Sequence, residues 1–240
     1  MTLDPAILLR GYAAGIFPMA DSREANELYW VEPNERAVIP LDGFHLSRSL
    51  NRTLRSGRFS VTRDTAFAEV VTHCAERAET WINRDIETAV LALHRAGHAH
   101  SVEIWSGDRL AGGLYGVKIG GAFFGESMFS RDRDASKVAL AWLVARLRAG
   151  HFRLLDCQIM TDHLQSLGAI GISKADYAVL LSAAIGPAGS GAGSGAAEAV
   201  GAAPAFGALD VLLEAAERGA EPGAGSPAGK VISQLLTQTS

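Results

Sequence analysis

The chain has 240 residues, a net charge of −4 and 48% hydrophobic residues. This length suits one or two domains with a buried core, and no apolar run approaches the ~18–20 residues that a membrane span needs. The first residues lack a basic stretch followed by an apolar one, so we expect no secretory signal. Two cysteines, Cys74 and Cys157, are too few for a disulfide framework, and together these features indicate a cytoplasmic protein.

Residues 1–58 predict a small N-terminal domain, which begins with a short helix and ends in a basic one. Residues 45–63 contain five arginines and no acidic residue. Arg48, Arg52 and Arg55 have the i, i+4, i+7 spacing that places side chains on one helix face. Such a stripe suits contact with a phosphate backbone, although a solvated helix face has the same pattern.

Residues 59–183 predict an α/β domain with a mixed sheet. The predicted strands are 59–63, 99–106, 109–119, 122–130 and 152–159, and the predicted helices are 65–77, 85–96, 134–149, 161–167 and 173–184. Tight turns at 106–108 and 120–121 separate the three central strands. The resulting order, β-α-α-β-β-β-α-β-α, is that of acetyl-CoA-dependent N-acetyltransferases, so we expect an N-acetyltransferase-like core.

Residues 184–240 have a different composition. Ala, Gly, Ser and Pro dominate up to about residue 228, with a short helix possible at 206–218. Such a sequence buries too little apolar surface to offset chain entropy, so we predict a flexible extension. The last eleven residues are more apolar and could dock on the core.

Polar residues in two apolar strands are the main indication of a functional site. Asp156 and Gln158 are two residues apart, so a regular strand would present them on one face and Cys157 on the other. Glu126 lies in another predicted strand. Leaving a buried polar group unpaired costs about 1–3 kcal/mol. We therefore expect these side chains to handle an amine that attacks a carbonyl, with ion pairing to an arginine of the core as the structural alternative.

A set of ordered motifs points to a family. The chain contains Gly-Tyr-Ala-Ala-Gly-Ile-Phe-Pro at 11–18, Thr-Trp-Ile at 80–82 and His-Ala-His-Ser-Val-Glu at 98–103. Gly-Glu-Ser-Met-Phe-Ser at 125–130, Asp-Cys-Gln at 156–158 and Ser-Leu-Gly-Ala at 166–169 follow. In this order they resemble the leucyl/phenylalanyl-tRNA–protein transferase family over roughly residues 5–182.

The resemblance implies an enzyme that moves Leu or Phe, and possibly Met, from aminoacyl-tRNA onto the N-terminal Arg or Lys of acceptor proteins. The product is marked for degradation by the N-end rule (N-degron) pathway. The implied catalytic residues are Asp156, which orients and deprotonates the amine directly or through Gln158, and Glu126, which faces the aminoacyl end. The aminoacyl ester is already activated, so no cofactor is expected. A monomer is the default for this family.

The resemblance also implies the binding residues. The apolar pocket for the donor side chain is expected from residues of the strands and of the facing helix: Leu114, Phe123, Met128, Phe129, Leu140, Leu143 and Leu147. Without the resemblance, we would assign these residues to the core. Tyr12 and Trp81 are candidates to stack on the terminal adenine of the tRNA, and Arg48, Arg52 and Arg55 are expected to contact its backbone. Met19 stands where many relatives have Trp.

Two other functions compete with this interpretation. An acetyl-CoA-dependent N-acetyltransferase would need a glycine-containing pyrophosphate loop, but residues 130–136 contain no glycine and two acidic residues. A non-catalytic tRNA-binding adaptor would use the basic helix alone and would leave Asp156, Gln158 and Glu126 unexplained. His94, His98 and His100 have no carboxylate or cysteine at ligand spacing, so no metal is expected.

Overall fold

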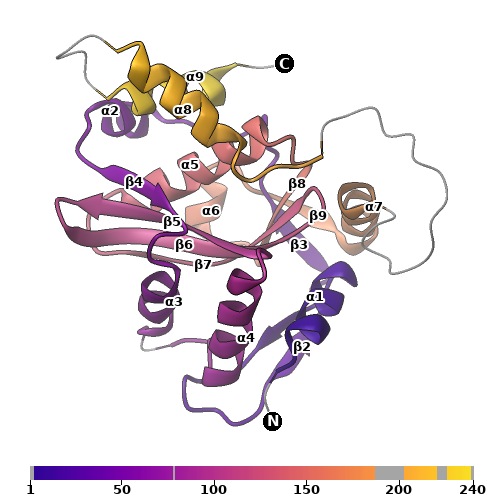
Figure 1. The fold of residues 1–240 in the computed structure, drawn as a ribbon. Helices are drawn as coiled ribbons and strands as arrows, with labels where there is room; N and C mark the ends of the chain where they lie inside the picture. Colours follow the sequence, from indigo (N-terminus) through magenta and orange to yellow (C-terminus); the bar gives the residue numbers. More distant parts are fainter. Residues whose placement is uncertain (1–2, 78, 187–202, 221–225, 239–240) are drawn as a thin grey trace.

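The computed structural model describes residues 3–77, 79–186, 203–220 and 226–238. Its centre is a seven-stranded sheet with the strand order β4-β5-β6-β7-β8-β3-β9 (Figure 1). The strands are β3 (Glu35–Val38), β4 (Ser60–Arg63), β5 (Ala99–Ser106), β6 (Arg109–Ile119), β7 (Ala122–Ser130), β8 (Leu154–Gln158) and β9 (Ile170–Ser173). Neighbouring strands are antiparallel except for β7 and β8, which are parallel. The predicted mixed sheet is thus confirmed.

The three central strands have the bounds predicted from the sequence, because a tight turn fixes each connection. Gly107 and Gly120 have φ values of +59° and +53°, which favour glycine. Strand β8 is shorter than predicted at both ends. Strand β9 was not predicted: it is a four-residue edge strand with little burial, so its sequence carries almost no periodic signal.

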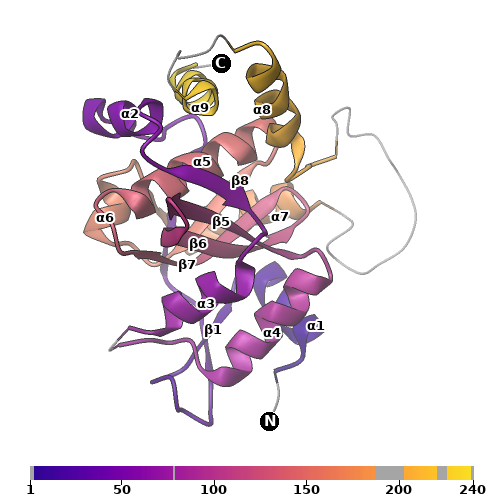
Figure 2. The same ribbon diagram turned by 60° about the vertical axis from the view of Figure 1, so that its left-hand side comes forward.

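Helices cover both faces of the sheet (Figures 1 and 2). One face carries α1 (Pro5–Ala13), α3 (Phe67–Ala75), α4 (Arg84–Arg95) and α7 (Lys174–Ile185), and the other carries α2 (Arg48–Arg55), α5 (Ala135–Ala149) and α6 (Asp162–Gln165). Helix α4 begins one residue earlier than predicted, because the side chain of Asn83 accepts a hydrogen bond from the Ile86 N–H and caps it. No helix in the described ranges is both long and apolar enough to cross a bilayer.

The N-terminal residues are divided between a separate ribbon and the main body. Strands β1 (Phe17–Met19) and β2 (Tyr29–Val31) form a two-stranded antiparallel sheet. Strand β3, in contrast, lies between β8 and β9 in the main sheet, and α2 packs against α5. A domain boundary at residue 58 stays a prediction, although elements before it complete the main sheet.

Part of the C-terminal extension is packed, where its composition predicted a flexible chain. Helices α8 (Ala208–Arg218) and α9 (Pro227–Thr237) contact α5, and α9 also contacts α2 (Figure 1). Phe206, Leu209, Ile232 and Leu236 are buried in the core shared with α5. These four large apolar residues are placed where they can anchor the extension, which average composition cannot reveal. Docking of the last apolar residues is confirmed up to Gln238.

Candidate active site

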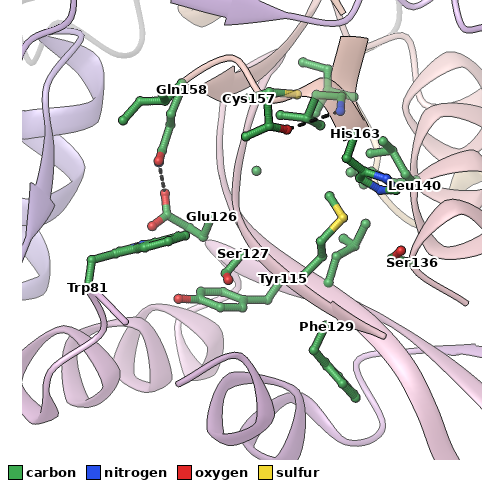
Figure 3. Close-up of a pocket in the computed structure, with 18 of the residues that line it drawn as sticks. Trp81, Tyr115, Glu126, Ser127, Phe129, Ser136, Leu140, Cys157, Gln158 and His163 are labelled. Atoms are coloured by element: carbon green, nitrogen blue, oxygen red, sulfur yellow. Dashed lines mark hydrogen bonds between the residues drawn. The ribbon is translucent and has the colours of Figure 1, made fainter. Parts of the chain in front are cut away.

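A cavity of about 510 Å³ lies where β7 and β8 separate (Figure 3). The two parallel strands pair only from Ala122 with Leu154 to Phe124 with Asp156. Strand β7 continues to Ser130, and its residues from Gly125 onward line the cavity. Most of the other lining residues are apolar. The volume falls within the range typical of small-ligand sites.

Five of the seven predicted pocket residues line this cavity. They are Leu114, Met128, Phe129, Leu140 and Leu143. Phe123 and Leu147 do not: both are fully buried in the core, and the Phe123 ring stacks on Phe206 with centroids 5.4 Å apart. Their assignment to the pocket is therefore wrong, because their side chains fill the space between the sheet and α5.

Glu126 occupies a β-bulge at the cavity. Tyr115 pairs with Ser127 and Gly116 with Gly125, so Glu126 is the extra residue of β7. A bulge redirects a side chain out of the regular alternation. Glu126 is the only carboxylate among the described lining residues, and it is 7% exposed. Burial, with the charge of Asp156 adding to it, raises its pKa to about 7, while Tyr12 and Gln158 partly offset this rise.

Gln158 connects Glu126 to Asp156. Its side-chain amide donates to Glu126 Oε1 at 2.6 Å (Figure 3). Its backbone N–H donates to Asp156 Oδ1 at 2.8 Å. The φ of Gln158 is +63°, a left-handed conformation that long side chains seldom adopt. The alternation expected for a regular strand ends there. As a result, Gln158 and Cys157 line the cavity, and Asp156 does not.

Asp156 is fully buried, and two residues besides Gln158 hold it. Arg36 donates two hydrogen bonds, from Nε to Oδ1 at 2.9 Å and from Nη2 to Oδ2 at 2.6 Å. The Tyr177 hydroxyl donates to Oδ2 at 2.7 Å. Burial and the charge of Asp156 raise the pKa of Tyr177, which keeps it a donor. A direct contact between Asp156 and the reacting amine is therefore not supported, because its oxygens are occupied and shielded from the cavity.

Arg36 is enclosed as tightly as its partner. Its guanidinium lies between the rings of Phe17 and Tyr177, 4.7 and 4.6 Å from their centroids, and its Nη1 donates to the carbonyl oxygen of Gly15 at 3.1 Å. Burial alone would lower the pKa of Arg36, but the hydrogen bonds and charge of Asp156 outweigh it and raise the pKa. The buried ion pair thus joins β3, β8, α7 and the N-terminal ribbon behind the cavity.

The two predicted stacking residues differ in exposure. Tyr12 is fully buried, with its ring 5.0 Å from that of Phe124, so it has no free face for a base. That assignment is wrong, because α1 presents Tyr12 to the core, where its ring packs against Phe124. Trp81 is half-buried and lines the cavity, as does Met19. Arg77 lies over the Trp81 ring, 6.0 Å from its centroid.

The predicted basic stripe lies on a short helix. Arg48, Arg52 and Arg55 are exposed on α2, while Leu50 and Leu54 face the core. In the part of the chain that the structure describes, none of the three arginines is paired with a carboxylate. Their charge is therefore free to meet an anionic partner.

Sequence reasoning missed the residues that support the site and some that line it. Arg36, Phe17 and Tyr177 lie far from residue 156 in sequence, and no local pattern connects them. Tyr115, Ser127, Ser136 and His163 also line the cavity. His163 follows the Asp-Cys-Gln motif by five residues and sits on α6, so its closeness to that motif was the one available signal.

The N-terminus of α5 is occupied by its own chain. The Ser136 N–H donates to Ser130 Oγ at 3.2 Å, and the Ala135 N–H donates to the carbonyl oxygen of Asp132 at 3.1 Å. Asp132 and Asp134 also lie there, paired with Arg109 and Lys137. Such an end is unfavourable for a pyrophosphate.

Comparison with known proteins agrees with these features. A model of the leucyl/phenylalanyl-tRNA protein transferase matches residues 38–182, and a model of the N-terminal domain of the same transferase matches residues 1–34. The chain belongs to the leucyl/phenylalanyl-tRNA–protein transferase family. The prediction made from the sequence motifs is thus confirmed, and the protein is a transferase rather than a non-catalytic adaptor.

Three relatives illustrate the extent of the match, each a leucyl/phenylalanyl-tRNA–protein transferase. The protein from Rhizorhabdus wittichii is 60% identical over 99% of both chains. The protein from Novosphingobium aromaticivorans is 51% identical over 99% of this chain and 97% of its own. The protein from Zymomonas mobilis is 58% identical over 76% of this chain and 70% of its own.

Proposed function

We propose that this transferase joins Leu or Phe, carried by tRNA, to the N-terminal Arg or Lys of an acceptor protein. The α-amine nitrogen attacks the ester carbonyl carbon, an amide bond forms, and the bond to the ribose oxygen breaks. An α-amine with a pKa of ~7.7–8.0 loses one proton to solvent before attack. Its second proton moves to the leaving ribose oxygen, so the reaction needs no cofactor. The tagged protein then enters the N-end rule pathway.

The donor side chain fits the apolar part of the cavity. Leu140 and Leu143 of α5 face Leu114 and Met128 of the sheet across it. An apolar pocket of this kind accepts Leu, Phe or Met and gains by removing them from water. Charged and small polar side chains would lose hydration there without a partner. This preference of the pocket for apolar side chains is the main support for Leu or Phe as the transferred residue.

In this proposal, Glu126 contacts the ammonium groups of the substrates. It is the one carboxylate among the described lining residues, and its pKa of about 7 leaves it partly ionised near neutral pH. Gln158 fixes its orientation with one amide hydrogen bond. A charge-assisted hydrogen bond from an ammonium group to this carboxylate is roughly twice as strong as one between neutral groups.

Asp156 acts through Gln158 and does not touch the substrate. It holds the Gln158 backbone in the left-handed conformation, and Arg36 and Tyr177 hold Asp156. We regard Asp156 and Arg36 as positioning residues. Such support matters because a displacement of about 1 Å at a reacting group can cost on the order of 10²-fold in rate.

In this proposal, the tRNA contacts the rim of the cavity and the basic helix α2. Trp81 is the aromatic side chain available to stack on the terminal adenine, which is worth about 1–3 kcal/mol per base. Arg48, Arg52 and Arg55 of α2 contact the phosphate backbone. The parallel β7–β8 pair that separates after three residues also supports an N-acetyltransferase-like core. We further expect a monomer that works in the cytoplasm.

A peptide assay tests the proposed reaction. The purified chain is mixed with Phe-tRNA or Leu-tRNA and a peptide that begins with Arg, and mass spectrometry follows the peptide. We expect a gain of one Phe or Leu residue, with a peptide beginning Met-Gly left unchanged. A parallel tube with acetyl-CoA should show no acetylation. Acetylation of the peptide, or no gain of Phe or Leu, would overturn the proposal.

A further inference from the structure

Helix α9 of the C-terminal extension lies beside the basic helix α2 (Figures 1 and 2). The Ser233 hydroxyl donates to Asn51 Oδ1 at 2.8 Å. At the end of α2, the Ser226 N–H donates to the carbonyl oxygen of Arg55 at 3.5 Å. We call this contact the α2–α9 seam; its residues are Asn51, Leu54, Arg55, Ser226, Gly229 and Ser233.

Gly229 allows α2 and α9 to approach each other closely. A Cβ added at this position would collide with the carbonyl oxygen of Leu54 and lie 2.8 Å from its carbonyl carbon. Both atoms are backbone, so no side-chain rotation relieves the clash. The seam can therefore close only with glycine at residue 229.

Helix α2 needs such support. It has eight residues, and isolated helices shorter than about 12–15 residues are marginal in water. One side of α2 is held by Leu50 and Leu54 in the core with α5, and α9 buries Ile232 and Leu236 in the same cluster. The arginines remain on the exposed side. The extension thus braces the helix without covering its charge.

The extension lies outside the part of the chain that defines the family. The family model ends at residue 182, whereas the match to the R. wittichii relative covers 99% of this chain and includes the extension. The seam is therefore an addition to the family's core and not a requirement of its chemistry.

We propose that the α2–α9 seam is a positioning element for tRNA: it holds α2 so that Arg48, Arg52 and Arg55 meet the phosphate backbone together. This inference rests on the proposed function. The seam sets the affinity for the tRNA body, and the cavity at β7 and β8 sets the chemistry. Loss of the seam therefore weakens binding of whole tRNA and leaves reaction with a minimal donor intact.

Gly229→Ala in the full chain tests this inference. The substitution opens the seam, although Ala favours a helix over Gly by about 1 kcal/mol. Gly219→Ala is the matched control, since a Cβ at Gly219 would meet its nearest atom at 3.7 Å. Ser233→Ala removes only the hydrogen bond to Asn51 and serves as a milder second variant.

Two substrates separate the outcomes: whole Phe-tRNA and a phenylalanyl ester of adenosine, which reaches the cavity but not α2. For Gly229→Ala, we expect the Kd for tRNA to rise about tenfold and the slope of log Kd against log salt to fall by about 1–2. We expect transfer from the adenosine ester to stay within about twofold of wild type, and Gly219→Ala to match wild type throughout.

Unchanged tRNA affinity in Gly229→Ala would overturn the inference. An equal loss with tRNA and with the adenosine ester would also overturn it, because the seam would then support the fold as a whole. If the wild-type chain used neither donor, the proposed reaction itself would be contradicted, and with it the role of the seam that rests on it.

Discussion

The two buried carboxylates of the site have opposite surroundings. Asp156 accepts hydrogen bonds from Arg36, Tyr177 and Gln158 and carries a paired charge. Glu126 faces the cavity beside Tyr12 and Gln158, and burial raises its pKa. Carboxyl groups in different environments take different roles in active sites. This contrast suits Glu126 to the titrating role and Asp156 to a structural ion pair with Arg36.

Replacing Glu126 by Gln should change the pH dependence of transfer. Because burial raises the pKa of Glu126 to about 7, its carboxylate form is lost as the pH falls below 7. The acceptor amine loses its neutral form over the same range, so log kcat/KM of the wild type should fall with a slope of about two. In Glu126→Gln, we expect a slope of about one and a rate on the order of 10²-fold lower at pH 8. Equal slopes in both proteins would contradict the role of Glu126.

Replacing Asp156 by Asn should destabilise the fold and keep the slopes of the pH profile, while the profile moves to lower pH because the charge of Asp156 no longer raises the pKa of Glu126. It leaves the buried guanidinium of Arg36 without a counter-charge, which typically costs about 3–5 kcal/mol. Urea unfolding measures this loss, and the double variant with Arg36→Gln should recover part of it. Transfer at a temperature where the variant is folded should be slower, with the same slopes against pH. A lost titration step would show instead that Asp156 is the base.

At the scale of helices and strands, the sequence predicted the features that depend on neighbouring residues in the chain. Strands β5, β6 and β7 are bounded by tight turns, and their ends could be read from glycine and charged residues. The bulge at Glu126 and the left-handed Gln158 could not, because they depend on the partner strand and on Asp156. The placement of Arg36 against Asp156 depends on strand order. The polar residues of the site could thus be predicted from the sequence. Which of them lines the cavity and which supports it from behind could not.

The C-terminal extension shows that composition alone does not predict which segments pack against the core. Phe206 is 3% exposed; its ring stacks on His100 at 4.2 Å and on Phe123 at 5.4 Å between centroids. Arg146 donates to its carbonyl oxygen at 2.8 Å and to Asp210 at 2.7 Å. Phe206 and Arg146 therefore add to the buried aliphatic residues that anchor a segment rich in Ala and Gly.

Replacing Phe206 by Ala tests whether the extension contributes to stability. Truncating a buried Phe to Ala typically costs about 3–5 kcal/mol, and we expect a loss of that order in urea unfolding. Leu212→Ala on α8 is the control: Leu212 is 44% exposed, so its loss should stay within about 0.5 kcal/mol. If the two variants are equally stable, the extension does not contribute to the fold.

At the scale of the whole molecule, the sheet brings distant segments to one place. The cavity takes its walls from β6, β7, β8, α5 and α6, and its rim from β1 and from the segment that holds Arg77 and Trp81. The basic helix α2 lies on the α5 side, braced by α9. In the proposed function, binding of the tRNA body and reaction at its end therefore depend on separate parts of one fold.

The position of β3 has a consequence for biogenesis. Arg36 and Asp156 are 120 residues apart in sequence, and among the described strands β3 pairs only with the late strands β8 and β9. At about 5–20 residues per second, a growing chain exposes β3 for several seconds before its partners are made. The nascent enzyme, surrounded by the charged tRNAs that feed translation, therefore cannot complete its own active site until synthesis has passed Tyr177.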